Sequence, residues 1–334
     1  MILITGATGF LGSYLAKSLI NKGEKIRALR RSTSGLELLG DYATKIEWVE
    51  GDLLDVTSLE KAVEGIEKIY HCASIISSTL LRSEQVALIN TNGSTNLLNM
   101  ALQKDVKKVL HVSSVAAMGT SVNGKIIDEN YFTPIAKNAP LYTKTKRHSE
   151  LEAWRAYAEG LPIVIVNPSA ILGAGYWHHE PMNMFDAVYG GLNIYTTGVN
   201  GFIDVRDTVE LMIQLMESNI SGERFILSAE NISLKTILEM VADELKVKRP
   251  KYQLNNFLAE IAWRYESARA IFTNSQPNFT KEDIRTAQIP FYYSNKKIIE
   301  ATGYKFRSIA ESVHETAQYF LESKKKKTDY AVFE

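Results

Sequence analysis

Cysteine is almost absent from this chain: Cys72 is the only one among 334 residues. A lone cysteine excludes a disulfide within the chain and a zinc site built from several thiolates. An excess of charge is absent as well, because lysine plus arginine total 38 and aspartate plus glutamate also total 38. Proteins that bind nucleic acid or anionic membranes need surplus positive charge, so the sequence predicts neither partner.

Long apolar runs are also missing. A membrane-spanning helix needs about 20 consecutive apolar residues, and no segment approaches that length. The first four residues already have the pattern of a strand, so no signal or transit peptide is expected before the fold. We therefore expect a soluble, cytoplasmic protein of ordinary globular composition, with 45% hydrophobic and 23% charged residues.

The first half of the sequence alternates short apolar runs with amphipathic stretches, which is typical of βαβ units and a parallel sheet. The expected strands are residues 2–5, 25–29, 46–50, 68–72, 109–113 and 163–167. One helix is expected after a cap at Thr57 or Ser58, and longer ones near residues 84–104 and 142–158. These elements predict an α/β fold with a doubly wound parallel sheet of the Rossmann type.

The alternation of apolar runs and amphipathic stretches ends after Pro168. Residues 173–201 show no strong period, residues 207–217 and 224–228 look like a helix and a strand, and the pattern from residue 233 onward is mostly helical. We expect a dinucleotide-binding domain at residues 1–169 plus about 201–230, and a smaller helical substrate-binding cap at about 170–200 plus 231–323. Residues 324–334, which begin with four lysines, are expected to form a flexible tail.

A glycine-rich segment joins the first strand to the first helix. Gly6, Gly9 and Gly12 are spaced so that the backbone can turn sharply and approach a pyrophosphate at the helix N-terminus. No Gly-Lys-Ser/Thr follows, which excludes a Walker-type loop. The alternative is a tight turn without a ligand. The residues expected to contact a dinucleotide here are Gly6, Thr8, Gly9, Phe10, Leu11 and Gly12.

The second strand ends at Arg30 and Arg31, where NAD-binding proteins usually have an acidic residue. A guanidinium group suits a 2′-phosphate, which a carboxylate would repel. The pair therefore favours NADP as the cofactor, with NAD as the second possibility. The alternative is a pair of solvated surface arginines.

The ends of the third and fourth strands complete the expected cofactor site. Asp52, followed by Leu53, is placed to accept a hydrogen bond from the adenine amino group, or else to cap the next helix. Cys72, Ala73 and Ser74 are small and leave room for a flat ligand at the carboxyl edge of the sheet. For Cys72, a buried filler is a better interpretation than a reactive thiol.

Three Tyr-x-x-x-Lys pairs occur in the chain, and their positions distinguish them. Tyr142 and Lys146 begin a predicted helix, and Ser114 ends the strand before it. The other two pairs lie in a C-terminal aromatic segment with no strand-end serine before them, so we assign them to packing. They are Tyr292 with Lys296 and Tyr293 with Lys297.

The pair at 142 and 146 has the residue types that proton transfer needs. Residues four apart share a helix face, with Cβ atoms about 5–6 Å apart. A free phenol has a pKa near 10, and a nearby ammonium together with a nicotinamide cation favours the phenolate. We expect Tyr142 to transfer a proton, Lys146 to assist it and hold the nicotinamide ribose, and Ser114 to orient the substrate oxygen. The alternative is a solvated Tyr and Lys at a helix start.

Taken together, these motifs resemble the extended short-chain dehydrogenase/reductase family, also called the NAD-dependent epimerase/dehydratase family. The matching segments are residues 5–12, 51–53, 90–96, 111–119, 142–146, 167–173 and 202–207. The resemblance implies Ser114, Tyr142 and Lys146 as the catalytic set, with Asn167 and Pro168 beside the cofactor. It also implies no metal, and homodimers through helices near residues 84–104 and 142–158 are common in the family.

Within the family, Asn167-Pro168 and Arg30-Arg31 look more like the dihydroflavonol-reductase and hydroxysteroid-dehydrogenase branch, in which Arg31 aligns with the arginine that meets the 2′-phosphate. That branch implies an oxidoreductase acting on a small carbonyl or secondary alcohol. The alternatives are a nucleotide-sugar epimerase or dehydratase with tightly bound NAD, and a non-catalytic dinucleotide sensor. One departure from the family pattern is Ala174-Gly175, where a proline is common.

The substrate clues lie after the sixth strand. Tyr176, Trp177 and the segment 178–180 (His-His-Glu) are placed to wall a pocket above the nicotinamide, and a plain solvated loop is an equal alternative. A metal site is not expected there, because adjacent side chains diverge and no third ligand is evident.

Overall fold

The computed structural model describes residues 1–75, 83–119, 124–131, 133–136, 139–179, 181–254, 263–264, 285 and 287–333. Seven parallel strands form its large sheet, in the order β11-β7-β5-β4-β1-β2-β3. Their bounds are β1 Ile2–Thr5, β2 Ile26–Arg30, β3 Glu47–Glu50, β4 Lys68–His71, β5 Lys108–Val112, β7 Ile163–Pro168 and β11 Glu223–Leu227. The chain winds outward in both directions from β1, so the doubly wound α/β prediction is confirmed.

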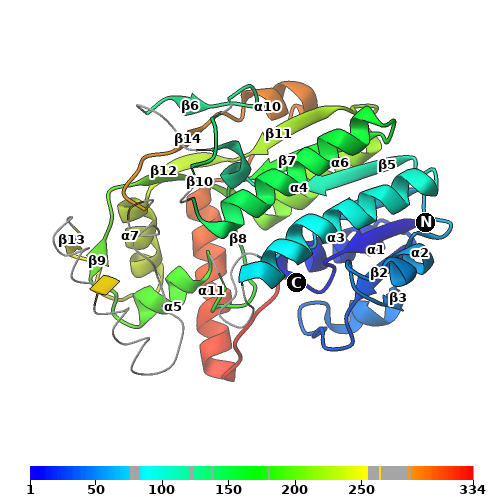
Figure 1. The fold of residues 1–334 in the computed structure, drawn as a ribbon. Coiled ribbons are helices and arrows are strands. Elements are labelled where there is room, and N and C mark those ends of the chain that lie inside the picture. The colour runs from blue at the N-terminus through cyan, green and yellow to red at the C-terminus, as the bar shows by residue number, and fades with distance from the viewer. Residues whose placement is uncertain are drawn as a thin grey trace.

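Helices cover both faces of this sheet (Figure 1). On one face lie α2 (Val56–Val63), α3 (Ser83–Gln103) and α4 (Leu141–Ala158), and on the other lie α1 (Phe10–Asn21) and α6 (Val205–Glu217). Successive side chains of β1 point to opposite faces of the sheet. Ile2 and Ile4 therefore pack with α1 and α6, while Leu3 packs with α2 and α3. Burial on both faces explains why the central strands β1, β5 and β7 consist mostly of apolar residues, whereas the edge strand β3 is partly exposed.

The second half of the chain adds small sheets and further helices. One sheet has the order β12-β10-β8, and two strand pairs are β13-β9 and β14-β6. The strands are β6 Ile126–Ile127, β8 Ala170–Leu172, β9 Ile194–Tyr195, β10 Val199–Asp204, β12 Glu230–Ser233, β13 Tyr252–Gln253 and β14 Tyr292–Tyr293. The helices are α5 Asn183–Tyr189, α7 Leu234–Glu244, α10 Lys296–Thr302 and α11 Ile309–Lys326, and short 3-10 turns are η1 Gly40–Lys45 and η2 Val115–Met118.

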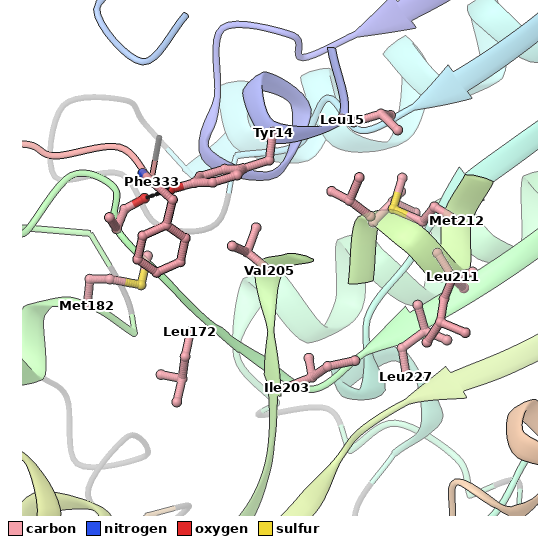
Figure 2. Close-up of a cluster of buried hydrophobic side chains, with 14 of the residues drawn as sticks. Tyr14, Leu15, Leu172, Met182, Ile203, Val205, Leu211, Met212, Leu227 and Phe333 are labelled. Carbon is pink, nitrogen blue, oxygen red and sulfur yellow. Dashed lines mark hydrogen bonds between the residues drawn. The ribbon is translucent and has the colours of Figure 1, made fainter. Parts of the chain in front are cut away.

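The hydrophobic cluster behind the large sheet continues into this second half. It runs from α1 and α6 through Phe185 of α5 and Val241 of α7 to Phe320 of α11. Figure 2 shows part of it, including Leu172 of β8, Ile203 of β10 and Val205 at the start of α6. The large sheet and the expected cap thus share one core, and the domain boundaries stay a prediction.

The C-terminal segment differs from the flexible tail that we expected. Helix α11 includes three of the four lysines, and the residues after it return to α1. The amide of Phe333 donates to the Tyr14 hydroxyl at 2.9 Å (Figure 2), and the Arg206 guanidinium lies 4.6 Å from the Phe333 ring. The amide of Ala331 donates to the carbonyl of Gly175 at 3.1 Å. Burial of the Phe333 ring offsets the entropy cost of ordering the chain end. The four lysines on which the prediction of a tail was based gave no sign of this contact.

Candidate active site

The loop between β1 and α1 needs glycine at two positions, because backbone atoms pass too close for a side chain. Gly6 has a φ of +76°, and a Cβ on it would lie 2.7 Å from the backbone nitrogen of Ala73. A Cβ on Gly12 would lie 2.1 Å from the carbonyl oxygen of Gly6. These two glycines let α1 begin directly at the end of β1.

The remaining glycine, Gly9, has the environment that an anion needs. It is exposed, it is the N-cap of α1, and no side chain caps that end of the helix. A dinucleotide pyrophosphate fits here, because it requires close backbone approach and the free amides and positive dipole of a helix N-terminus. Gly9, the half-buried Thr8 and the amides of the first turn would hold it.

Phe10 and Leu11 have side chains packed against the core, so only their backbone faces the expected pyrophosphate. A Cβ on Gly175 would lie 2.7 Å from the Phe10 ring, and one on Gly173 would lie 3.3 Å from it. This contact gives the departure at 174–175 a physical reason, because Gly175 leaves room for the ring of the residue that starts α1.

The two arginines at the end of β2 lie in different surroundings. The Arg30 guanidinium lies 5.3 Å from the ring centre of Trp48 on β3, a cation–π contact that holds it beside the strand end. Arg31 is exposed, and its carbonyl accepts the amide of Ser34 in the following turn. The Arg30 guanidinium therefore lies beside the strand end, where a 2′-phosphate would lie, and Arg31 is the next residue along the chain.

The end of β3 corrects one local expectation. Helix α2 begins after Asp55, whose carboxylate accepts the amides of Thr57 and Ser58, so the cap expected at Thr57 or Ser58 is wrong. Asp52 instead accepts the amide of Leu54 at 2.9 Å. Leu53 is buried, and its role beside an adenine stays a prediction.

The end of β4 lies next to the glycine loop, since Ala73 is the residue that Gly6 approaches. Burial raises the pKa of the Cys72 thiol to about 12, which agrees with a filler rather than a nucleophile. Asn90 on α3 fixes the segment after Ser74, because it accepts from the amide and donates to the carbonyl of Ile75, both at 2.8 Å.

The two serines after β5 have different partners. Ser113 is buried and donates to a carboxylate oxygen of Glu150 at 2.6 Å. Ser114 is half-buried and its hydroxyl accepts the amide of Ala116 at 3.2 Å. A hydroxyl can accept and donate at once, so Ser114 keeps an O–H that can reach a ligand. This difference supports Ser114 over Ser113 as the substrate-orienting serine.

Helix α4 brings Lys146 to the end of the sheet. Its Nζ donates to the carbonyl of Val112 at 2.9 Å, two residues before Ser114. Burial lowers the pKa of Lys146 to about 8, and Cys72 and Glu150 oppose the shift. The group is therefore mostly an ammonium at pH 7. Tyr142, half-buried in the first turn of α4, lies one turn before it on the same helix face.

Of the other two Tyr-x-x-x-Lys pairs, which we assigned to packing, only Tyr293 with Lys297 lies against the rest of the protein. Tyr293 is buried and stacks on Phe291, and Lys297 pairs with Glu223 at 2.6 Å. Tyr292 and Lys296 are exposed at β14 and the start of α10.

A buried polar network behind the site was not expected from the sequence. The His71 ring bonds Thr5 Oγ1 at 2.7 Å and Ser94 Oγ at 2.8 Å, so it links β1, β4 and α3. Ser149 on α4 donates to Ser94 and lies 3.2 Å from the ring of His111 on β5. A histidine within an apolar strand pattern was the only sequence signal for it.

Burial lowers the pKa of His71 to about 3, and Lys146 adds to the shift. The unfolded chain then binds a proton below about pH 6.5 that the folded chain rejects, so stability falls as pH falls through 6.5. We expect the unfolding free energy to fall by about 2 kcal/mol from pH 7 to pH 5 through the titration of His71 alone. Urea unfolding at both pH values measures it. In His71→Gln this pH dependence should shrink, and an unchanged slope would contradict the assignment.

The segment after β8 differs from the expected pocket wall. Trp177 is buried between Phe185 and Phe320, 6.2 and 5.1 Å away between ring centres, so it belongs to the core. The Tyr176 hydroxyl donates to Glu37 at 3.1 Å on the β2 side of the molecule. His178 and His179 are exposed, and Glu180 lies outside the described residues.

The described part of the chain contains neither a metal-binding cluster nor a membrane-spanning helix. No group of three His, Cys, Asp or Glu side chains there is arranged to hold a metal ion. No helix in those same ranges is long and apolar enough to cross a membrane.

Comparison with known proteins places the chain among relatives over most of its length. A sterol demethylase protein B from Methylococcus capsulatus is 30% identical over 289 residues, covering 85% of this chain and 87% of the relative. A Synechocystis protein assigned as a dihydroflavonol 4-reductase is 31% identical over 329 residues, covering 95% and 93%. The crystal structure of gox2253 is 28% identical, with a TM-score of 0.83 over 96% of this chain and 98% of that one.

A family model described as the NAD dependent epimerase/dehydratase family matches residues 2–227. The match includes the glycine loop, the Ser114 segment and the start of α4. Because it spans more than half of the chain, the chain belongs to the NAD-dependent epimerase/dehydratase family, the extended short-chain dehydrogenases/reductases.

Proposed function

We propose that the protein is an NADP-dependent oxidoreductase acting on a small carbonyl or secondary alcohol. The observation that carries the proposal is the position of Lys146 at the end of β5, which joins the Tyr142 helix to the Ser114 strand end beside the glycine loop. The relative assigned as a dihydroflavonol 4-reductase supports a reductase over an epimerase.

The residues present suit a nicotinamide cofactor, which when bound supplies a hydride for the carbonyl carbon. Gly9 and the first turn of α1 would hold its pyrophosphate, and Lys146 would hold its nicotinamide ribose. Tyr142 then gives its phenolic proton to the carbonyl oxygen, so that hydride and proton together complete the alcohol. Ser114 donates a hydrogen bond to the same oxygen and orients it.

Arg30 and Arg31 support NADP over NAD, because Arg30 ends β2 and the exposed Arg31 follows it directly. Each can make charge-assisted hydrogen bonds to a 2′-phosphate. Arg31 is the better candidate for direct contact, since it is exposed while Arg30 is stacked on Trp48.

A panel of aldehydes, ketones and nucleotide sugars, each run with NADPH and with NADH, tests the proposal. We expect NADPH oxidation at 340 nm with one or more carbonyl compounds, and Arg31→Ala to raise KM for NADPH but not for NADH. Lys45→Ala, a surface cation outside β2, is the matched control. Better turnover with NADH would contradict the role of the arginines, and epimerisation of a nucleotide sugar without net cofactor oxidation would favour an epimerase.

A homodimer through α3 and α4 and a cytoplasmic location stay predictions. The apolar side chains that such a dimer would cover include Leu88 and Leu151, which are 45% and 50% exposed.

A further inference from the structure

Glu150 is a buried carboxylate on the same face of α4 as the proposed catalytic pair. It follows Lys146 by one helical turn and Tyr142 by two turns. Its side chain is only 3% exposed. A buried ionised group is costly unless its oxygens are fully bonded, so its partners indicate what it is for.

Two of those partners lie on strands of the large sheet, β7 and β11, and the third directly follows β5. One oxygen of Glu150 accepts from Ser113 Oγ at 2.6 Å and from Asn167 Nδ2 at 2.7 Å. Ser113 directly follows β5, and Asn167 lies on β7. The other oxygen accepts from the guanidinium of Arg224 on β11 at 3.0 Å. The carboxylate thus fixes α4 against the carboxyl ends of β5 and β7.

Asn167 extends this connection to the proposed substrate-orienting residue. The same amide nitrogen that donates to Glu150 also donates to the carbonyl oxygen of Ser114 at 3.0 Å. Two short paths therefore join Glu150 to the Ser114 segment, one through the Ser113 hydroxyl and one through the Asn167 amide. Lys146, bonded to Val112, forms a third tie between α4 and the same strand end.

We propose that Glu150 is a positioning residue, which sets the distance and orientation between Ser114 on the sheet and Tyr142 and Lys146 on α4. The proposal rests on the oxidoreductase function proposed above. Geometry of this kind matters because proton transfer needs a phenol and a substrate oxygen within hydrogen-bond reach. A misplacement of about 1 Å can cost about 10²-fold in rate.

A cavity of about 330 Å³ is lined by Glu150 together with Arg224, Glu223 and Lys297. In a variant that lacks the Glu150 side chain, this cavity gives a small anion access to the space that the carboxylate occupied. It also supplies a matched control, because Glu223 lines the same cavity but pairs with Lys297 instead of with the strand ends.

The first test compares Glu150→Gln with Glu223→Gln. For Glu150→Gln we expect kcat to fall about 10²-fold with the Kd of NADPH unchanged, since the glycine loop is untouched. The basic limb of its pH profile should also move to lower pH, because the negative charge that favours protonated Lys146 is lost. Glu223→Gln should behave as wild type. An unchanged kcat and pH profile in Glu150→Gln would overturn the proposal.

Glu150→Ala gives a second test, in which acetate added to the buffer should restore part of the lost turnover and chloride should not. Ser113→Ala removes the bond between Ser113 and Glu150 but keeps the ion pair between Glu150 and Arg224. It therefore tests the positioning role even if the Glu150 variants do not fold. It should lower kcat by a smaller factor, and a wild-type kcat would overturn the proposal.

Hydrogen–deuterium exchange separates this inference from the proposed function. In Glu150→Gln or Ser113→Ala, we expect faster exchange confined to residues 113–118 and 141–146. Exchange unchanged in these segments, or raised equally throughout the chain, would overturn the positioning role. This result decides the role even if wild type turns over no carbonyl, in which case the proposed function alone fails.

Discussion

Replacing Tyr142 with phenylalanine is expected to lower kcat by about 10²–10⁴-fold, the usual contribution of a general acid or base. The substitution keeps the ring and removes only the oxygen that the proposed chemistry uses. Cofactor affinity should stay the same, because the glycine loop and Lys146 are unchanged. Steady-state kinetics and NADPH fluorescence titration measure the two quantities separately.

Tyr292→Phe is the matched control for this prediction. Tyr292 has a lysine at the same spacing, but it lies on β14 and is 37% exposed. Its loss should leave kcat unchanged. If Tyr142→Phe retained most of the wild-type turnover, the assignment of the proton donor would be wrong.

Gly12→Ala and Gly9→Ala are expected to fail in different ways, although both alter the same loop. A methyl group on Gly12 would overlap the carbonyl oxygen of Gly6, which is backbone and cannot rotate away. We expect Gly12→Ala to lose about 3 kcal/mol of unfolding free energy, at the upper end for an overpacked site. Urea unfolding measures this loss.

A methyl group on Gly9 meets only the carbonyl oxygen of Gly6, at 3.3 Å, and the residue has an ordinary negative φ of −86°. Gly9→Ala should therefore keep the fold. It should weaken NADPH binding by about tenfold or more, or about 1.4 kcal/mol, because the methyl occupies the approach to the helix N-terminus. Wild-type NADPH affinity in Gly9→Ala would contradict the assigned pyrophosphate position.

The sheet was predictable because its signal is local. Strands β1, β5 and β7 are buried throughout and consist mostly of apolar residues, and each of the six expected strands agrees with the structure to within one residue at each end. Part of the glycine loop was predictable for a related reason, since Gly12 is dictated by a backbone contact with Gly6 in the same loop, whereas Gly6 itself approaches Ala73 after β4. The preference for Ser114 over Ser113 stays a prediction, which the bond from Ser113 to Glu150 supports.

The parts that were not predicted depend on contacts between distant segments. Trp177 looked like a pocket residue until Phe185 and Phe320 were placed around it. The end of the chain looked solvated because its lysines dominate the local pattern, yet Phe333 reaches Tyr14, 319 positions away. The His71 network and the partners of Glu150 likewise require the strand order, which no local pattern contains.

Transfer of deuterium to product from NADPH that carries deuterium at both C4 positions tests the central claim most directly. One turnover with a carbonyl substrate from the panel should place one deuterium on the carbinol carbon of the product for each NADPH oxidised. Mass spectrometry of the product and absorbance at 340 nm give the two quantities. Wild-type protein that binds NADPH and a substrate but leaves the cofactor unoxidised and the product unlabelled would contradict the account.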